Sequence, residues 1–340
     1  MVKGINFLKY KISKTKLGSQ IFCPPLKSID LELTNSCNFS CKMCFFRNKS
    51  VKRKIGFMSS SFFNRLILEL SEKNRNSNIG LNFSGESLLH PNFSKMVFCL
   101  IKNGFRNLGL STNGSLIHLN LDGVSQIKDV RISIDGFKET HEKVRAGANY
   151  EKIVDNVFRL TNLSGERGCS LNLVKGFQNE DEIKKFVNFW VNKVDCVAIS
   201  EQLDSNLKLV TTNEDIEKVL DGDRQICLFP WRYMAILWDG SVTLCCHDLS
   251  GDLLLDSNLR VMNIESVWAS SEYKYIRRSH QKLDFSNLHL CETCEAWAGD
   301  HVTPKVSKLG NVYVVRYGLC TYYSRRFQPI LNWKRLLYYS

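Results

Sequence analysis

Between residues 29 and 200 the sequence alternates between short apolar segments and longer amphipathic ones, which restricts the chain to few folds. The short segments fit buried β-strands, and the longer ones carry apolar residues at helical spacing. The predicted strands cover 29–33, 79–83, 107–112, 130–134, 169–174 and 196–199, and the predicted helices cover 62–70, 92–102, 150–163 and 180–191. This order predicts an α/β fold in which helices cover a parallel sheet.

Four of the predicted strands are followed directly by a polar signature. The signatures are Cys37–Cys44, Ser84–Ser87, Ser111–Gly114 and Ser133–Gly136. In an α/β barrel the carboxyl ends of the strands meet at one edge, and active sites are built there. We therefore expect these four segments to form one functional site.

The 13 cysteines are clustered rather than scattered. Their number is odd, and the chain begins without the apolar segment of a secretory signal, so a disulfide framework is a poor explanation. One group contains Cys37, Cys41 and Cys44, and a second contains Cys227, Cys245, Cys246, Cys291 and Cys294. Clustered thiols in a reducing, cytoplasmic compartment point to a soft metal site, either zinc or iron–sulfur.

The first group has the spacing C-x3-C-x2-C. Three thiolates in so short a loop do not close a tetrahedral zinc site without a distant fourth ligand. They can hold three irons of a [4Fe–4S] cluster and leave the fourth iron open to a cofactor or substrate. Zinc is the alternative interpretation.

The same loop resembles the signature of the radical S-adenosylmethionine (SAM) superfamily. The likeness extends to Glu32-Leu-Thr-Asn before the first cysteine and to the later strand ends. Ser84-Gly-Glu-Ser resembles the family's Gly-Gly-Glu-Pro motif but departs from it at Ser84 and Ser87. The resemblance implies a partial (β/α)6, TIM-like barrel over 29–205, with a [4Fe–4S] cluster held by Cys37, Cys41 and Cys44.

The resemblance also implies which residues bind SAM. The backbone at Gly85 and the acid of Glu86 would hold its amino group. Ser133 and Arg145 would grip its carboxylate, Met43 would lie against the adenine, and Asn113 belongs to the strand-end motif between them. The implied chemistry is one-electron cleavage of SAM to methionine and a 5′-deoxyadenosyl radical, which takes a hydrogen atom from an unactivated carbon. A reductant such as flavodoxin or ferredoxin would supply the electron, and no catalytic residue is assigned.

In the second group, Cys227, Cys245, Cys291 and Cys294 can close a four-thiolate site, and spacing alone leaves zinc and iron–sulfur equally open. Segment 227–300 resembles the SPASM/twitch extension, which implies a small hairpin-and-helix domain with an auxiliary [4Fe–4S] cluster for electron transfer. We expect a hairpin around Trp238-Asp-Gly, a helix over Ile264–Arg278, and a linker over 206–226.

Two further cysteines of this region have other predicted roles. We choose Cys245 over Cys246 as the ligand because Cys245 fits the register Asp-Gly-x-Val-x-x-Cys. Cys246 and Cys320 are then candidates to return a hydrogen atom to a substrate radical. Such a return would give epimerisation, whereas loss of an electron to the auxiliary cluster would give oxidation or a new bond.

The two ends of the chain carry its whole net charge of +12. Residues 1–22 hold five lysines and no acid, and residues 301–340 hold seven basic residues and no acid. We expect the basic segments 1–28 and 301–340 to meet an anionic partner such as an acidic peptide, lipid headgroups or nucleic acid. No apolar run reaches the roughly 18 residues of a membrane span, so membrane contact would be peripheral.

Three functions fit these observations. The first is a maturase that acts on a ribosomally made peptide. The second is a dehydrogenase or epimerase of a sugar or aminocyclitol, with the basic C-terminal segment on a membrane surface. The third is a non-catalytic, metal-stabilised nucleic-acid binder, which the lack of any known nucleic-acid module disfavours.

Overall fold

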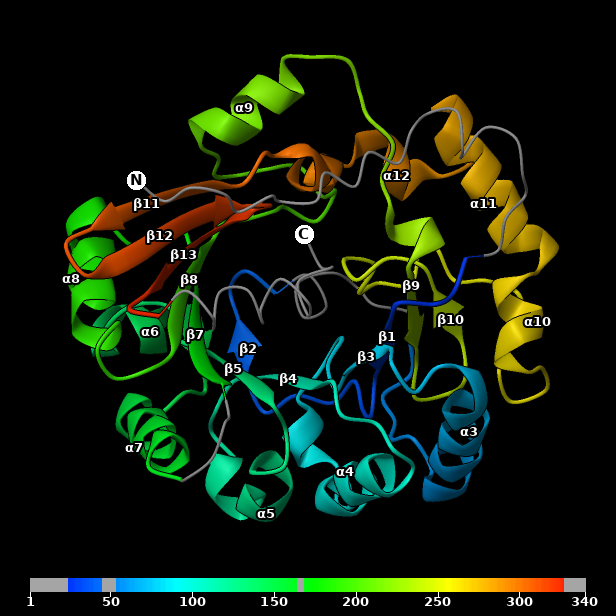
Figure 1. The fold of residues 1–340 in the computed structure, drawn as a ribbon, viewed down its shortest axis with the longest axis horizontal. Helices are drawn as coiled ribbons and strands as arrows, with labels where there is room; N and C mark the ends of the chain where they lie inside the picture. The colour runs from blue at the N-terminus through cyan, green and yellow to red at the C-terminus, as the bar shows by residue number, and fades with distance from the viewer. Residues whose placement is uncertain (1–23, 45–52, 164–167, 327–340) are drawn as a thin grey trace.

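The structure is a computed structural model that describes residues 24–44, 53–163 and 168–326. Its centre is a curved sheet with the strand order β10-β9-β1-β3-β4-β5-β7-β8-β13-β12-β11 (Figure 1). Six neighbouring strands of this sheet pair in parallel: β1 (Ser28–Leu31), β3 (Asn78–Gly80), β4 (Leu108–Thr112), β5 (Asp129–Ser133), β7 (Gly168–Val174) and β8 (Cys196–Ser200). The predicted α/β fold with a partial (β/α)6 barrel is confirmed.

Helices follow these strands and lie on the outer side of the sheet (Figure 1). They are α3 (Ser60–Lys73), α4 (Phe93–Lys102), α5 (Leu121–Val124), α6 (Lys138–Val144), α7 (Tyr150–Thr161) and α8 (Glu180–Trp190), with the 3-10 turns η1 (Ser87–Leu89) and η2 (Ile117–Leu119) between them. Side chains of Ser59, Asn149 and Asn179 cap the first turns of α3, α7 and α8. Such caps satisfy backbone N–H groups that have no partner inside the helix.

The two faces of the sheet differ in polarity, as β1 illustrates. Ile29 and Leu31 are fully buried in the large apolar cluster that joins the sheet to its helices. Asp30, between them, is on the opposite face, where it accepts hydrogen bonds from Asn82 Nδ2 at 2.9 Å and from the Tyr233 hydroxyl at 2.8 Å. Because successive side chains point to opposite faces of a strand, the apolar pattern leaves a polar inner face.

Both edges of the six-stranded sheet are completed by later residues. β9 (Tyr233–Ile236) pairs in parallel with β1 and forms the predicted hairpin with β10 (Val242–Thr243). At the other edge β13 (Cys320–Ser324) pairs antiparallel with β8 and continues into β12 (Val312–Tyr317) and β11 (Lys305–Leu309).

The predicted basic tail 301–340 is therefore, in its described part, an extension of the sheet. Valines and tyrosines are frequent there, and Gly310 and Gly318 have the positive φ angles of tight turns, +59° and +63°. These are the ordinary signals of β-hairpins. The five lysines of residues 1–22, together with Lys334 and Arg335, lie outside the described residues.

The remaining C-terminal elements are helical. They are α9 (Glu214–Leu220) in the predicted linker, η3 (Phe229–Trp231), α10 (Ile264–Trp268), α11 (Ser271–Lys282), α12 (His289–Thr293) and η4 (Ala296–His301). The helix predicted over Ile264–Arg278 is divided in two, because Ser270 caps α11 by accepting from the Tyr273 N–H at 3.2 Å. Within the described ranges, no helix has the length and apolar character needed to cross a membrane.

Candidate active site

The loop with the first cysteine group leaves β1 and runs beneath the strand ends. Cys37, Cys41 and Cys44 are half-buried and free of disulfides. Cys41 belongs to β2 (Ser40–Cys41), which pairs with β6 (Arg145–Ala146) so that Cys41 faces Arg145. Burial raises the pKa of Cys41 to about 11, while the Arg145 charge lowers it and the other two thiols raise it. The three thiols are thus close enough to repel one another as thiolates.

This donor set suits a cluster that has one thiolate on each of three irons. Nowhere in the described ranges do three His, Cys, Asp or Glu side chains converge on a point where they could hold one metal ion. The three thiols are soft sulfur donors of one short loop, and this donor set fits the implied cluster.

Arg145 is fixed between the cysteine loop and two strand ends. Its Nε donates to Asp135 Oδ2 at 2.7 Å, and the side chains of the pair are 11% and 0% exposed. Its Nη1 lies 3.8 Å from Cys41 Sγ. Asp135 Oδ1 accepts from the Val174 N–H at 2.8 Å, and Ser133 ends β5 two residues before Asp135. The role of Asp135 as an anchor was not predicted, although Asp-Gly after a strand is a visible signal in the sequence.

Gly85 lets the Ser84–Ser87 segment lie directly against the start of the cysteine loop. Its φ is +83°, and a Cβ there would be 2.6 Å from the Thr34 carbonyl oxygen and 2.7 Å from Asn35 Cα. The next residue donates its N–H to the Ser36 carbonyl at 2.8 Å. Only glycine combines this conformation with this close approach.

Glu86 braces the ends of β3 and β4. Its carboxylate is buried and accepts from Leu88 N at 3.1 Å, Thr112 Oγ1 at 2.8 Å and Asn113 N at 2.8 Å. Burial raises its pKa, and these three hydrogen bonds lower it again. The structure thus gives Glu86 a supporting role, and contact with the SAM amino group stays a prediction.

Asn113 ties the end of β4 to the cysteine loop. Its Nδ2 donates to Asn38 Oδ1 at 2.9 Å, and Asn38 Nδ2 donates to Ser115 Oγ at 3.0 Å. Ser115 Oγ in turn donates to Asn113 Oδ1 at 2.7 Å. The structure places Asn38 between the first two cysteines and Met43, half-buried, between the last two. Five of the six predicted SAM-binding residues therefore lie at the strand ends or in the cysteine loop, and Arg145 lies in β6, paired with Cys41 of that loop.

The four predicted ligands of the second cysteine group come from three segments. Cys227 precedes η3, Cys245 follows β10, Cys291 is in α12, and Cys294 caps that helix. Burial raises the pKa of Cys245 well above its usual value, and the thiols of Cys246, Cys294, Cys227 and Cys291 raise it further. The four predicted ligands are therefore near neighbours.

Cys246 has a different environment from Cys245. Burial raises its pKa well above the usual value, and Asp30 and Asp300 add to this rise. Cys246 packs with Cys227 against the apolar cluster of Phe229, Tyr233, Ala235 and Leu237. Cys320, the other candidate donor, begins β13 and pairs with Ser200 at the carboxyl end of β8. Its Sγ lies 3.2 Å from Ser200 Oγ. A role for either thiol in hydrogen return stays a prediction.

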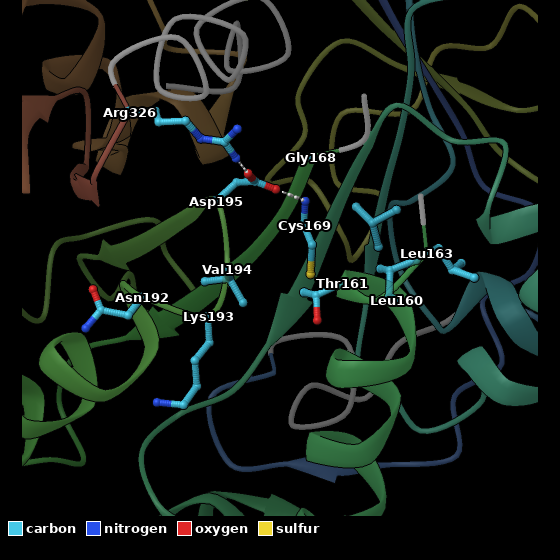
Figure 2. Close-up of a pocket in the computed structure, with 11 residues that line it drawn as sticks. Leu160, Thr161, Leu163, Gly168, Cys169, Asn192, Lys193, Val194, Asp195 and Arg326 are labelled. Carbon is cyan, nitrogen blue, oxygen red and sulfur yellow. Dashed lines mark hydrogen bonds and ion pairs between the residues drawn. The ribbon is translucent and has the colours of Figure 1, made fainter. Parts of the chain in front are cut away.

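A cavity of about 290 Å³ lies at the opposite, amino-terminal ends of β5 and β7 (Figure 2). Asp195 accepts there from the Cys169 N–H at 2.9 Å and pairs with Arg326. Of the described residues that line this cavity, none is a predicted site residue. The predicted SAM-binding residues lie instead on the side of the cysteine loop, toward the carboxyl ends of the strands.

Two family models match the chain. The model of the radical SAM superfamily matches residues 31–189, and that of the SPASM iron–sulfur cluster-binding domain matches residues 227–295. A tungsten-containing aldehyde ferredoxin oxidoreductase cofactor-modifying protein of Pyrococcus furiosus is 23% identical in an alignment of 304 positions that covers 74% of this chain and 83% of that protein.

Solved structures share the fold at low sequence identity. Streptococcus suis SuiB bound to its precursor peptide SuiA gives a TM-score of 0.61 at 14% identity, over 83% of this chain and 73% of that one. BtrN in complex with S-adenosylmethionine and 2-DOIA gives a TM-score of 0.52 at 20% identity, over 78% of this chain and 92% of that one. The structure of anSMEcpe with S-adenosylmethionine and the Cp18Cys peptide gives a TM-score of 0.57 at 18% identity, over 81% of this chain and 87% of that one.

Proposed function

The chain belongs to the radical SAM superfamily and carries a C-terminal SPASM iron–sulfur domain, and we propose that it is a maturase of a ribosomally made peptide. When bound, SAM and the [4Fe–4S] cluster supply a carbon-centred radical strong enough to remove hydrogen from an unactivated carbon. The protein must hold both groups in a fixed geometry. The observation that carries the assignment of the SAM and cluster site is the pair of contacts that Arg145 makes with Asp135 and Cys41.

The residues of the first site have separate roles in this proposal. Cys37, Cys41 and Cys44 hold the cluster, and Arg145 with Ser133 receives the SAM carboxylate beside Cys41. The absence of a side chain at Gly85 leaves room beside the cysteine loop, and Met43 provides a polarisable surface for the adenine. Glu86 and Asn113 keep the strand ends and the loop in register through their hydrogen bonds.

The second site holds the auxiliary cluster of the SPASM domain. We assign its ligands as Cys227, Cys245, Cys291 and Cys294, whose thiols are near neighbours. Four protein ligands leave no open iron, which suits electron transfer rather than SAM binding. A one-electron reductant such as flavodoxin or ferredoxin is the expected partner.

A peptide substrate is supported by the free edge of the sheet. In the described part of the chain β11 pairs with β12 alone, and all five of its residues are exposed. An extended peptide can add to such an edge through main-chain hydrogen bonds. Structures similar to this chain have peptides bound, namely SuiA and Cp18Cys.

A sugar or aminocyclitol is the second candidate substrate. The inner face of the sheet carries hydrogen-bonding side chains, for example Ser200, whose hydroxyl donates to Asn172 Oδ1 at 2.7 Å. Such a surface suits a molecule rich in hydroxyl groups. BtrN, whose structure contains 2-DOIA, is covered over 92% of its length.

The first experiment is the iron, sulfide and zinc content of the anaerobically reconstituted chain. About eight irons with matching sulfide are expected for two [4Fe–4S] clusters. Stoichiometric zinc without iron would overturn the proposal and favour the metal-stabilised nucleic-acid binder. Release of 5′-deoxyadenosine with SAM and dithionite, and its stimulation by peptides encoded beside the gene or by aminocyclitols, then separates the two substrate classes.

The basic ends are proposed to bind an anionic partner. Lys308 and Arg325 are the described cations of segment 301–340 that belong to no ion pair with an acid among the described residues. Sedimentation with vesicles of phosphatidylserine tests a peripheral membrane contact. Binding that persists at high salt would contradict an electrostatic origin.

A further inference from the structure

Arg224 lies on the backbone of the helix that carries two of the second-group cysteines. Its Nη2 donates to the Cys291 carbonyl, and its Nη1 donates to the Glu292 carbonyl at 3.0 Å. The guanidinium carbon lies 4.4 Å from the ring centre of Phe285 and 5.7 Å from that of Trp297. Carbonyl oxygens and two aromatic rings thus fix the guanidinium beside α12.

The charge of Arg224 is not cancelled by a carboxylate of the described residues. Among the ion pairs in the described part of the chain it takes part in none, whereas Arg232, on the Cys227 side, pairs with Asp300. Glu295, the acid next to Cys294 in the sequence, accepts at its Oε2 from the Leu209 N–H at 2.8 Å. Because arginine stays protonated at all ordinary pH values, the Arg224 charge is permanent.

The field of this charge reaches the proposed ligands. Arg224 donates to the backbone carbonyl of Cys291, one of these ligands, and to that of Glu292, two residues before the other ligand of this helix end, Cys294. Arg224 is half-buried against the Phe285 and Trp297 rings, so water screens its charge only in part.

We propose that Arg224 is a positioning residue that sets the reduction potential of the auxiliary cluster. This inference rests on the ligands proposed for that cluster. A cluster bound by four thiolates is anionic, and reduction adds a further negative charge. A fixed cation beside the ligands therefore favours the reduced form and makes the cluster a better electron acceptor.

The test compares Arg224→Gln and Arg224→Lys with the wild-type full chain by redox titration monitored by electron paramagnetic resonance. A preparation with Cys37, Cys41 and Cys44 replaced by alanine assigns the auxiliary signals. We expect Arg224→Gln to lower the midpoint potential of the auxiliary cluster and to leave the SAM-site cluster unchanged. Arg224→Lys, which keeps the charge, should restore most of the potential.

Arg260→Gln is the matched control. Arg260 also donates to carbonyl oxygens, those of Asp239 and Trp238, and it also lies over an aromatic ring, that of Phe62. It is exposed, and its carbonyl partners belong to the turn between β9 and β10 rather than to α12. Its replacement should leave both potentials unchanged.

Two outcomes would overturn the inference. One is an unchanged auxiliary potential in Arg224→Gln at full iron content. The other is equal loss of iron from Arg224→Gln and Arg224→Lys, because the residue would then only support α12. If the proposed auxiliary cluster itself is wrong, the wild-type chain will lack the second set of about four irons, which distinguishes that failure from a failure of the Arg224 inference.

Discussion

The guanidinium of Arg53 and the carboxylate of Glu32 form an ion pair whose side chains are only 7% and 0% exposed. The same guanidinium donates to Ser84 Oγ at 3.1 Å and to the Leu249 carbonyl at 3.5 Å. One side chain thus connects the start of the cysteine loop, the end of β3 and the SPASM domain. Ser84, which replaces a glycine of the family motif, donates its hydroxyl to Glu32 and so belongs to this network.

Replacing Arg53 by methionine should destabilise the chain strongly. Glu32 would be left buried without its partner, which typically costs about 3–5 kcal/mol. The thermal unfolding midpoint under anaerobic conditions measures the effect. The exposed pair of Lys73 and Glu265 is the control, with side chains 66% and 73% exposed, and Lys73→Met should change the midpoint little. Equal shifts for the two variants would contradict the importance of the buried pair.

Gly85→Ala should damage the first cluster site. A methyl group there would overlap the backbone at Thr34 and Asn35, and the φ of +83° is strained for alanine. We expect loss of at least about 2 kcal/mol and a reduced iron content, since the cysteine loop must move. Gly310→Ala separates backbone strain from steric overlap. Its φ is +59°, so the strain is present, but no atom lies within 4 Å of the added Cβ. That variant should lose only about 1 kcal/mol and keep its iron.

Arg145→Met should weaken SAM binding. The proposed carboxylate partner would be lost, and Asp135 would remain buried without its ion pair. We expect the SAM dissociation constant to rise at least about tenfold, which corresponds to about 1.4 kcal/mol. Isothermal titration calorimetry on the iron-loaded chain measures it. Arg159→Met, which removes an exposed pair with Asp155, should bind SAM normally.

Asp129 should make stability depend on pH. Burial raises its pKa to about 6 from an ordinary 3.8, with Lys128 and Arg131 opposing the rise. The folded chain therefore holds this proton up to about pH 6, whereas the unfolded chain releases it near pH 4. Stability contributed by the protonated group is full below pH 4 and is lost as the pH rises to about 6, by up to about 3 kcal/mol.

The variant Asp129→Asn removes this titration. It should unfold at a higher temperature than the wild type at pH 7.5, and the two midpoints should converge near pH 4. Because other groups titrate in both chains, the difference between the two midpoints is the quantity to follow. A difference that does not change with pH would contradict the raised pKa of Asp129.

Local patterns were enough to predict the barrel and the cluster loop. The strands of β5 and β7 are short apolar runs, and the cysteine spacing lies within one loop, so neither depends on distant residues. The hairpin of β9 and β10 was predicted for the same reason. The break between α10 and α11 was missed although Ser270 is a good cap, because apolar periodicity continues across it.

The supporting residues could not be predicted because their partners are far away in the sequence. Leu249 is 196 residues from Arg53, and Cys291 is 67 residues from Arg224. Neither arginine belongs to a motif, and either would pass for a surface cation in the sequence. The placement of β13 against β8 was hidden for a related reason, since a strand pattern does not reveal which edge it joins.

The sheet also has a consequence for the order of synthesis. β9 closes the β1 edge and β13 closes the β8 edge, yet both leave the ribosome after the six barrel strands. A nascent chain that ends before Cys320 therefore presents an unpaired β8, and unpaired edges invite pairing between molecules. We expect ribosome-bound intermediates to depend on chaperones, and truncations before β13 to accumulate in inclusion bodies.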